Sequence, residues 1–120
     1  MDFFMATYKF SFTISSKGFG DVIDITDKIE SFLLNQTFNN GIVYIYNNSN
    51  NVAIKNFEIK KYKQKMADEN FQKFLISCNN NMLLLPIIDK KLYIDEMARI
   101  LFIDFEKSSN IRKIIVMCVT

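Results

Sequence analysis

Residues 8–15 read YKFSFTIS, and this stretch decides the fold class. Aromatic or aliphatic side chains at every second position alternate with polar ones. This is the period-two pattern of a β-strand with one buried face and one solvated face. It is the clearest strand in the sequence and predicts a β-rich protein.

Further strands are predicted along the rest of the chain. Pro86 has no N–H group to donate to a sheet, so its strand is expected at a sheet edge or a bulge. A hairpin is expected at residues 89–91. The predicted strands cover residues 42–46, 82–88, 92–94, 100–105 and 111–119, and residues 52–54 also favour extended structure.

One helix is predicted over residues 26–35. Thr26 or Asp27 can accept hydrogen bonds from N–H groups of the first turn, and Glu30 follows Asp27 at the spacing of a capping box. One face of this helix is apolar because its apolar residues recur at i, i+3 and i+4. They are Ile29, Phe32 and Leu33.

Apolar spacing predicts a second helical block over residues 57–77. Runs of strands with segregated helices indicate an α+β protein. The same pattern also allows a sandwich with helices on one face. A length of 120 residues suits a single domain over residues 1–120.

The chain contains no histidine. Histidine is the one side chain whose unperturbed pKa lies near neutrality, and it is also the commonest metal ligand. Its absence excludes histidine-dependent triads. The acids are not clustered at ligand spacing, and Cys78 and Cys118 are far apart, so no metal or cofactor is expected. We interpret the chain as a non-enzyme.

Charge and hydropathy limit the partners and the location. A net charge of +2 is too small for a nucleic-acid footprint over the surface, and the lysines of residues 60–65 are interpreted as a solvated helix face. The longest apolar runs are far shorter than the roughly 20 residues that cross a bilayer, and no signal-peptide pattern is present. We expect a cytoplasmic protein with no nucleic-acid or membrane partner.

Two polar groups of residues are candidate sites. Asp104 and Glu106 fall on one face of a predicted strand, where they could form an acid/base pair, but we interpret them as a solvated strand face. Residues 47–51 form an amide-rich loop that could line a pocket, although loop chemistry also explains them.

Four segments occur in an order and spacing that resemble the YjbQ family, whose members are named secondary thiamine-phosphate synthases. They are FGDVIDITDKI (19–29), NGIV (40–43), LPIID (85–89) and RILFIDF (99–105). The resemblance covers nearly the whole chain. It implies an α+β fold, a β-sandwich of mainly antiparallel strands with the two helical blocks on one side, usually assembled as a homotrimer.

The same resemblance locates a candidate ligand-binding site. The family's Pro-His-Thr-Thr-like loop falls on residues 48–51, where Ser49 stands in place of the histidine, and the acid that follows the loop is similar in position to Glu58. Ser49, Asn50, Asn51 and Glu58 are therefore the candidate ligand-binding residues. A serine hydroxyl does not titrate near neutrality, so we expect synthase activity to be lost or vestigial.

Two functions follow from this pattern. The first is a degenerate YjbQ-like scaffold that is catalytically inactive and binds a small ligand or a related subunit. The alternative is an enzyme with altered site chemistry, in which Glu58 acts as the base because burial raises its pKa.

Overall fold

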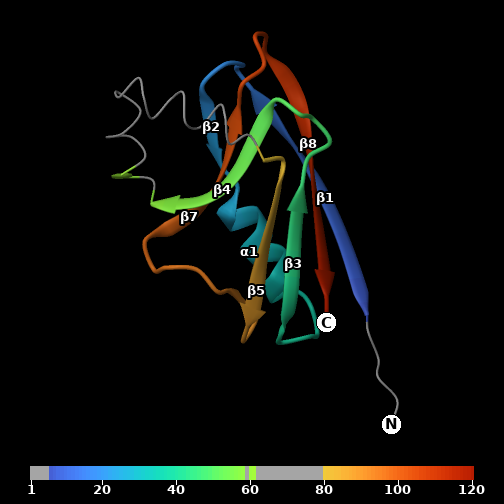
Figure 1. Ribbon diagram of the computed structural model, residues 1–120. Helices are drawn as coiled ribbons and strands as arrows, with labels where there is room; N and C mark the ends of the chain where they lie inside the picture. The colour runs from blue at the N-terminus through green and yellow to red at the C-terminus, as the bar shows by residue number, and fades with distance from the viewer. Residues whose placement is uncertain (1–5, 59, 62–79) are drawn as a thin grey trace.

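The strands form two antiparallel sheets that pack against each other (Figure 1). The computed structural model describes residues 6–58, 60–61 and 80–120, and within these residues it contains eight strands, the helix α1 and two further helical residues, Lys60 and Lys61. In chain order the strands and the helix are β1 (Thr7–Ser16), β2 (Asp21–Asp24), α1 (Thr26–Leu34), β3 (Gly41–Tyr46), β4 (Val52–Glu58), β5 (Met82–Ile88), β6 (Lys91–Leu92), β7 (Ala98–Asp104) and β8 (Asn110–Val119).

The large sheet has the strand order β1-β8-β3-β5-β6, and the small sheet has the order β2-β7-β4. Neighbouring strands in both sheets run antiparallel. The prediction of an α+β fold with mainly antiparallel strands is confirmed.

The strand predicted from residues 8–15 is β1, at one margin of the large sheet. It pairs with β8 over ten residues without interruption, from Thr7 opposite Val119 to Ser16 opposite Asn110. Its apolar residues point into the molecule, where Phe10 and Phe12 pack against the buried core and Ile14 is part of it. The alternating pattern therefore describes one buried and one exposed face correctly.

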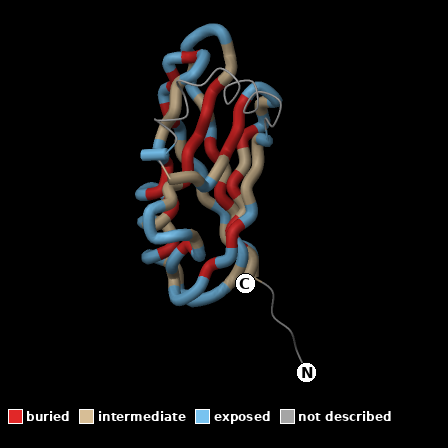
Figure 2. The backbone as a smooth tube through the Cα atoms, turned by 60° about the vertical axis from the view of Figure 1, so that its left-hand side comes forward, coloured by how far each residue is buried: buried red, intermediate tan, exposed pale blue. Residues whose placement is uncertain are grey.

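The main core lies between the two sheets, and α1 contributes Ile29 and Leu33 to it. Figure 2 shows the buried residues running along the central strands. Successive residues of β7 pack in two different clusters. Ile100 and Phe102 belong to the main core. Leu101 and Ile103 pack with Ala53 in a second cluster. Both faces of β7 are thus buried, which explains its unbroken apolar sequence.

The predicted capping box of α1 is wrong. Thr26 is turned toward the sheet, where its hydroxyl donates to Asp24 Oδ1 (2.6 Å) and accepts the Ile100 N–H (2.7 Å). Asp27 instead accepts a hydrogen bond from Arg99 Nη2 (2.8 Å). These bonds join the start of the helix to β7 in place of a side-chain cap, which α1 lacks.

The second predicted helical block is wrong at its start, because Phe57 and Glu58 belong to β4. Lys60 and Lys61 are helical, as predicted, and the rest of the block lies outside the described residues. The hairpin prediction is confirmed: Asp89 and Lys90 have φ values of 52° and 65° and connect β5 to β6, as a type I′ turn requires. Pro86 comes just before the residues that pair with β6, Ile87 and Ile88, and its carbonyl accepts the Tyr93 N–H (2.9 Å), so it does not lie at a free edge.

Replacing Thr26 by valine is expected to destabilise the fold by about 1–3 kcal/mol. Thr26 is 1% exposed, so its loss leaves the buried Ile100 N–H without its partner. Urea unfolding monitored by circular dichroism measures the change. Thr13→Val on the exposed face of β1 is the matched control, and an equal effect of the two substitutions would contradict this account of the helix start.

Candidate functional site

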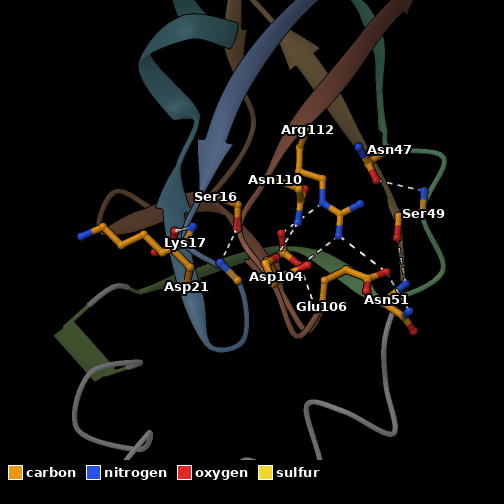
Figure 3. Close-up of polar contacts among 12 residues, drawn as sticks. Ser16, Lys17, Asp21, Asn47, Ser49, Asn51, Asp104, Glu106, Asn110 and Arg112 are labelled. Atoms are coloured by element: carbon orange, nitrogen blue, oxygen red, sulfur yellow. Dashed lines mark hydrogen bonds and ion pairs between the residues drawn. The ribbon is translucent and has the colours of Figure 1, made fainter.

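A buried ion pair joins the two sheets at one end of the sandwich (Figure 3). Asp104 ends β7 in the small sheet, and Arg112 lies on β8 in the large sheet. Arg112 donates from Nε to Asp104 Oδ2 and from Nη2 to Asp104 Oδ1, both at 3.0 Å. The side chain of Asp104 is 0% exposed and that of Arg112 is 12% exposed. The pair is therefore a two-bond clamp shielded from water.

Neighbouring polar groups complete this network. Glu106 donates its N–H to Asp104 Oδ1 (2.9 Å), and its own carboxylate accepts a hydrogen bond from Asn51 Nδ2 (2.9 Å) and lies 3.8 Å from Arg112 Nη2. The interpretation of Asp104 and Glu106 as a solvated strand face is wrong for Asp104. The reason is that the chain turns back after Glu106 and places Arg112 over Asp104.

Burial and hydrogen bonding act in opposite directions on Asp104. Burial disfavours its charge, but hydrogen bonds from the Arg112 and Ser16 side chains and the Glu106 N–H outweigh this effect and hold the pKa of Asp104 below its ordinary value. Asp104 is therefore ionised at neutral pH and cannot serve as a proton donor there.

The loop of residues 47–51 lies beside this network and is folded onto itself. Asn47 is buried; it donates from Nδ2 to the Lys113 carbonyl (2.8 Å) and accepts the Ser49 N–H (2.9 Å). The Ser49 hydroxyl accepts the Asn51 N–H (3.2 Å). Asn50 is exposed at the tip of the loop. Ser49, which stands where the family resemblance places a histidine, thus makes a bond within its own loop.

Glu58 lies far from this loop. β4 begins with Val52 opposite Asp104 and ends with Glu58 opposite Ala98, a span of roughly 20 Å at about 3.3 Å per residue. Within one subunit the structure therefore does not bring Glu58 together with Ser49, Asn50 and Asn51.

A separate cavity of about 230 Å³ adjoins Glu58. Glu58 forms an ion pair with Lys61 (Oε2 to Nζ, 3.4 Å) at this cavity. The cavity is lined by Asn56, Phe57, Glu58, Lys61, Asp95, Met97 and Ala98. Its lining is mixed, with apolar side chains beside two acids, Glu58 and Asp95, of which Glu58 is paired with Lys61.

Other reactive groups have structural surroundings. Burial raises the pKa of the Cys118 thiol to about 11, so this cysteine is protonated and inert at neutral pH. Cys78 lies outside the described residues. Within the described ranges, no three acids or cysteines lie close enough to hold a metal ion, and no helix is long and apolar enough to cross a membrane.

Sequence reasoning missed the two arginines, which each hold two carboxylates. Arg112 contacts Asp104 and Glu106, and Arg99 bonds Asp24 (2.7 Å) and Asp27. One signal was available: the chain has only these 2 arginines among its 15 basic residues. The arginine guanidinium can bind a carboxylate with two hydrogen bonds at once. In a chain whose other basic residues are lysines, the two arginine positions therefore predict where carboxylates are bound in this way.

Comparison with known proteins identifies the fold. Neither the known protein-family models nor the curated proteins give a match. Among solved structures, a YbjQ-like protein of unknown function from Sulfolobus solfataricus superposes with a TM-score of 0.76 at 20% identity, over 97% of this chain and 99% of that one. An uncharacterised conserved protein of the YjbQ/UPF0047 family from Clostridium acetobutylicum gives 0.74 at 16% identity, over 91% and 98%.

The chain has the YjbQ-like fold. A second protein from C. acetobutylicum, a structural-genomics target, gives a TM-score of 0.77 at 16% identity and covers 94% of this chain and 100% of its own. The resemblance inferred from four short segments is thus confirmed for the fold. In this YjbQ-like chain, the loop of residues 47–51 adjoins the buried ion pair through the bond from Asn51 to Glu106.

Asp104→Asn is expected to lower the free energy of unfolding by about 3 kcal/mol, the low end of the cost of breaking a buried ion pair, because Arg112 loses the carboxylate that it binds with two hydrogen bonds and keeps only Glu106 at 3.8 Å. Glu106→Gln is the control: its carboxylate is more exposed, so we expect a loss of about 0–1 kcal/mol. Urea unfolding at pH 7 compares them. Similar losses for both would show that the buried pair has no special role.

Acid should weaken the fold through the same group. Since the pKa of Asp104 is lower in the folded chain than its ordinary value of 3.8, its stabilising effect is complete above that value and is lost as the pH falls below it. The free energy of unfolding, measured from pH 6 down to pH 2, should fall less steeply for Asp104→Asn than for the natural chain. Parallel curves would contradict this assignment.

Proposed function

We propose that this YjbQ-like chain is a non-catalytic scaffold subunit that works by binding copies of itself, as a homotrimer. The observation that carries the proposal is an apolar surface on the outer side of the large sheet. Its residues lie at the positions of β3, β5 and β8 that alternate with the core positions. They are Ile42, Tyr44, Tyr46, Met82, Leu84, Pro86, Ile115, Met117 and Val119, and we call them the outer apolar face.

Strand register arranges these nine residues in three cross-strand rows. Ile42 lies between Pro86 and Val119, Tyr44 between Leu84 and Met117, and Tyr46 between Met82 and Ile115. Ile42 and Leu84 are 50% and 55% exposed. A continuous apolar surface of this kind on a folded protein marks an interaction site.

The composition of the outer apolar face suits an interface between proteins. Tyr44 and Tyr46 stack with ring centroids 6.0 Å apart, and the Tyr44 hydroxyl lies 3.7 Å from Met82 Sδ. Tyrosine and methionine are enriched at interfaces, and charged residues are depleted in the interface core.

The face also has a sharp boundary. On the next strand, β1, the residues opposite Val119, Met117 and Ile115 are Thr7, Lys9 and Ser11. The same side of the same sheet thus changes from apolar to polar between β8 and β1. Because the apolar residues are confined to three strands, we infer that a partner surface covers them and leaves β1 in water.

The polar residues support a non-catalytic role. The ionised Asp104 is bound by Arg112, Ser49 bonds within its loop, and Asn47 is buried and satisfied. We therefore expect the purified protein to give no turnover of a pyrimidine alcohol diphosphate with a thiazole phosphate. A rate clearly above that of buffer contradicts the proposal.

One observation favours the alternative of an enzyme with altered chemistry. Glu58 lies at the 230 Å³ cavity with Asn56 and Asp95, and thus has room for a small ligand. If any turnover is found, Glu58→Gln should abolish it. An unchanged rate in that variant removes the case for Glu58 as the base.

Assembly is tested by light scattering after size exclusion. At low micromolar concentration we expect about 42 kDa, three times the chain mass of 14.1 kDa. Tyr44→Glu and Leu84→Glu should each give about 14 kDa, because a buried unpaired carboxylate at the interface is costly. Asn48→Glu, on an exposed loop, should keep the trimer. A monomeric natural chain, or a trimer that survives both face substitutions, contradicts the proposal.

A further inference from the structure

The outer edge of β1 presents a row of backbone hydrogen-bonding groups. The Thr120 N–H donates to the Ala6 carbonyl (3.1 Å), so even-numbered residues of β1 bond to β8 in the antiparallel pattern. The odd-numbered residues then direct their N–H and C=O groups away from β8. They are Thr7, Lys9, Ser11, Thr13 and Ser15, and among the described residues no strand pairs with this edge.

This edge has little of the protection that long edge strands usually carry. Native sheets block their edges with proline, bulges, charges or short strands. β1 is ten residues long, pairs with β8 without a bulge, and has one charged residue, Lys9. Figure 1 shows β1 at the outer margin of the sheet, beyond β8. It is therefore competent to accept a further strand.

An aromatic cavity lies beneath the same strand. Its volume is about 470 Å³, and it lies between β1 and α1. Phe10 stacks on Phe32 with ring centroids 4.8 Å apart, and Lys28 Nζ lies 5.5 Å from the centroid of Phe12. Asp27 and Lys28 both line the cavity, so its rim carries no excess charge that would repel an identical rim.

We propose that β1 pairs antiparallel with β1 of a second copy, across a twofold axis at Ser11. In this register Ser11 faces the partner's Ser11, Lys9 faces the partner's Thr13, and Phe10 faces the partner's Phe12. Every residue from Thr7 to Ser15 is paired, and the odd-numbered residues occupy the hydrogen-bonded positions.

Charge and packing select this register. Pairing centred on Lys9 would oppose two ammonium groups, which is unfavourable for directly opposite residues. Pairing centred on Ser11 avoids this and places each Phe10 beside an aromatic ring of the partner on the inner side of the sheet, over the cavity. Aromatic cross-strand pairs favour such a contact.

This pairing is independent of the proposed trimer. The outer apolar face lies on β8, β3 and β5, whereas the edge lies on the far side of β1 from β8. Twofold contacts between trimers give a closed assembly of dihedral symmetry. The edge contact has a small area and is expected to form at higher concentration than the trimer.

The test uses the full chain with Tyr44→Glu, which removes the proposed trimer contact, in sedimentation equilibrium from low to high micromolar concentration. We expect a monomer–dimer equilibrium. Adding Ser11→Glu or Ser11→Lys should weaken dimerisation by about fivefold, since like charges then face each other at the axis. An equimolar mixture of the Ser11→Glu and Ser11→Lys variants should restore dimerisation, because opposite charges then face each other at the axis. Neither misfolding nor the loss of a side-chain contact could produce this recovery.

Hydrogen exchange gives the second readout. On dimerisation, the amides of Lys9, Ser11 and Thr13 should gain protection, whereas those of Phe10 and Phe12 should be protected at all concentrations. A mass that does not change with concentration, charged variants that dimerise unchanged, or a mixture that stays monomeric overturns the proposal. The two proposals fail separately. If the natural chain is a monomer at low concentration and a dimer at high concentration, the proposed trimer is wrong and the edge pairing stands.

Discussion

The buried pair of Asp104 and Arg112 is the constraint on which the polar end of this molecule depends. One member belongs to the small sheet and the other to the large sheet; the side chain of Asp104 is fully buried and that of Arg112 is only 12% exposed. Because a buried charge without a counterion costs several kcal/mol, the two sheets are held in one relative position at this end. Glu106 and Asn51 are then ordered by the same network.

This constraint explains how a YjbQ-like chain without histidine uses the region where the resemblance suggests chemistry. Asn47 and Ser49 take part in bonds that shape the loop, and Asp104 has a counterion that keeps it charged. Such groups contribute to the stability of this end of the molecule. The outer apolar face has the opposite character, since its nine side chains contribute little to the core and gain free energy only when something covers them.

Local patterns predicted much of the fold. Alternation revealed β1, and apolar runs revealed β5, β7 and β8, because those signals depend only on residues close in sequence. β2 was missed because Asp21–Asp24 is short and mixes apolar and acidic residues.

The predicted capping box is wrong because the Thr26 hydroxyl accepts the N–H of Ile100, which is 74 residues away. Asp104 appeared solvated because its partner comes from a strand in the other sheet. The sequence located the loop at residues 47–51 as part of the candidate site. It did not show that this loop lies far from Glu58, because that distance depends on how β4 pairs with β7.

The central claim is that the outer apolar face is covered in the native assembly, and methionine oxidation tests it most directly. Met82 and Met117 lie on this face, and Met97 is exposed elsewhere on the same chain. Limited peroxide treatment of the natural protein, followed by peptide mass spectrometry, should oxidise Met97 quickly and Met82 and Met117 slowly. The difference should shrink in Ile42→Glu, a substitution on the same face whose cross-strand partners are Pro86 and Val119 and not the two methionines. Equally slow oxidation of Met82 and Met117 in Ile42→Glu, or oxidation of both at the rate of Met97 in the natural chain, would contradict the account.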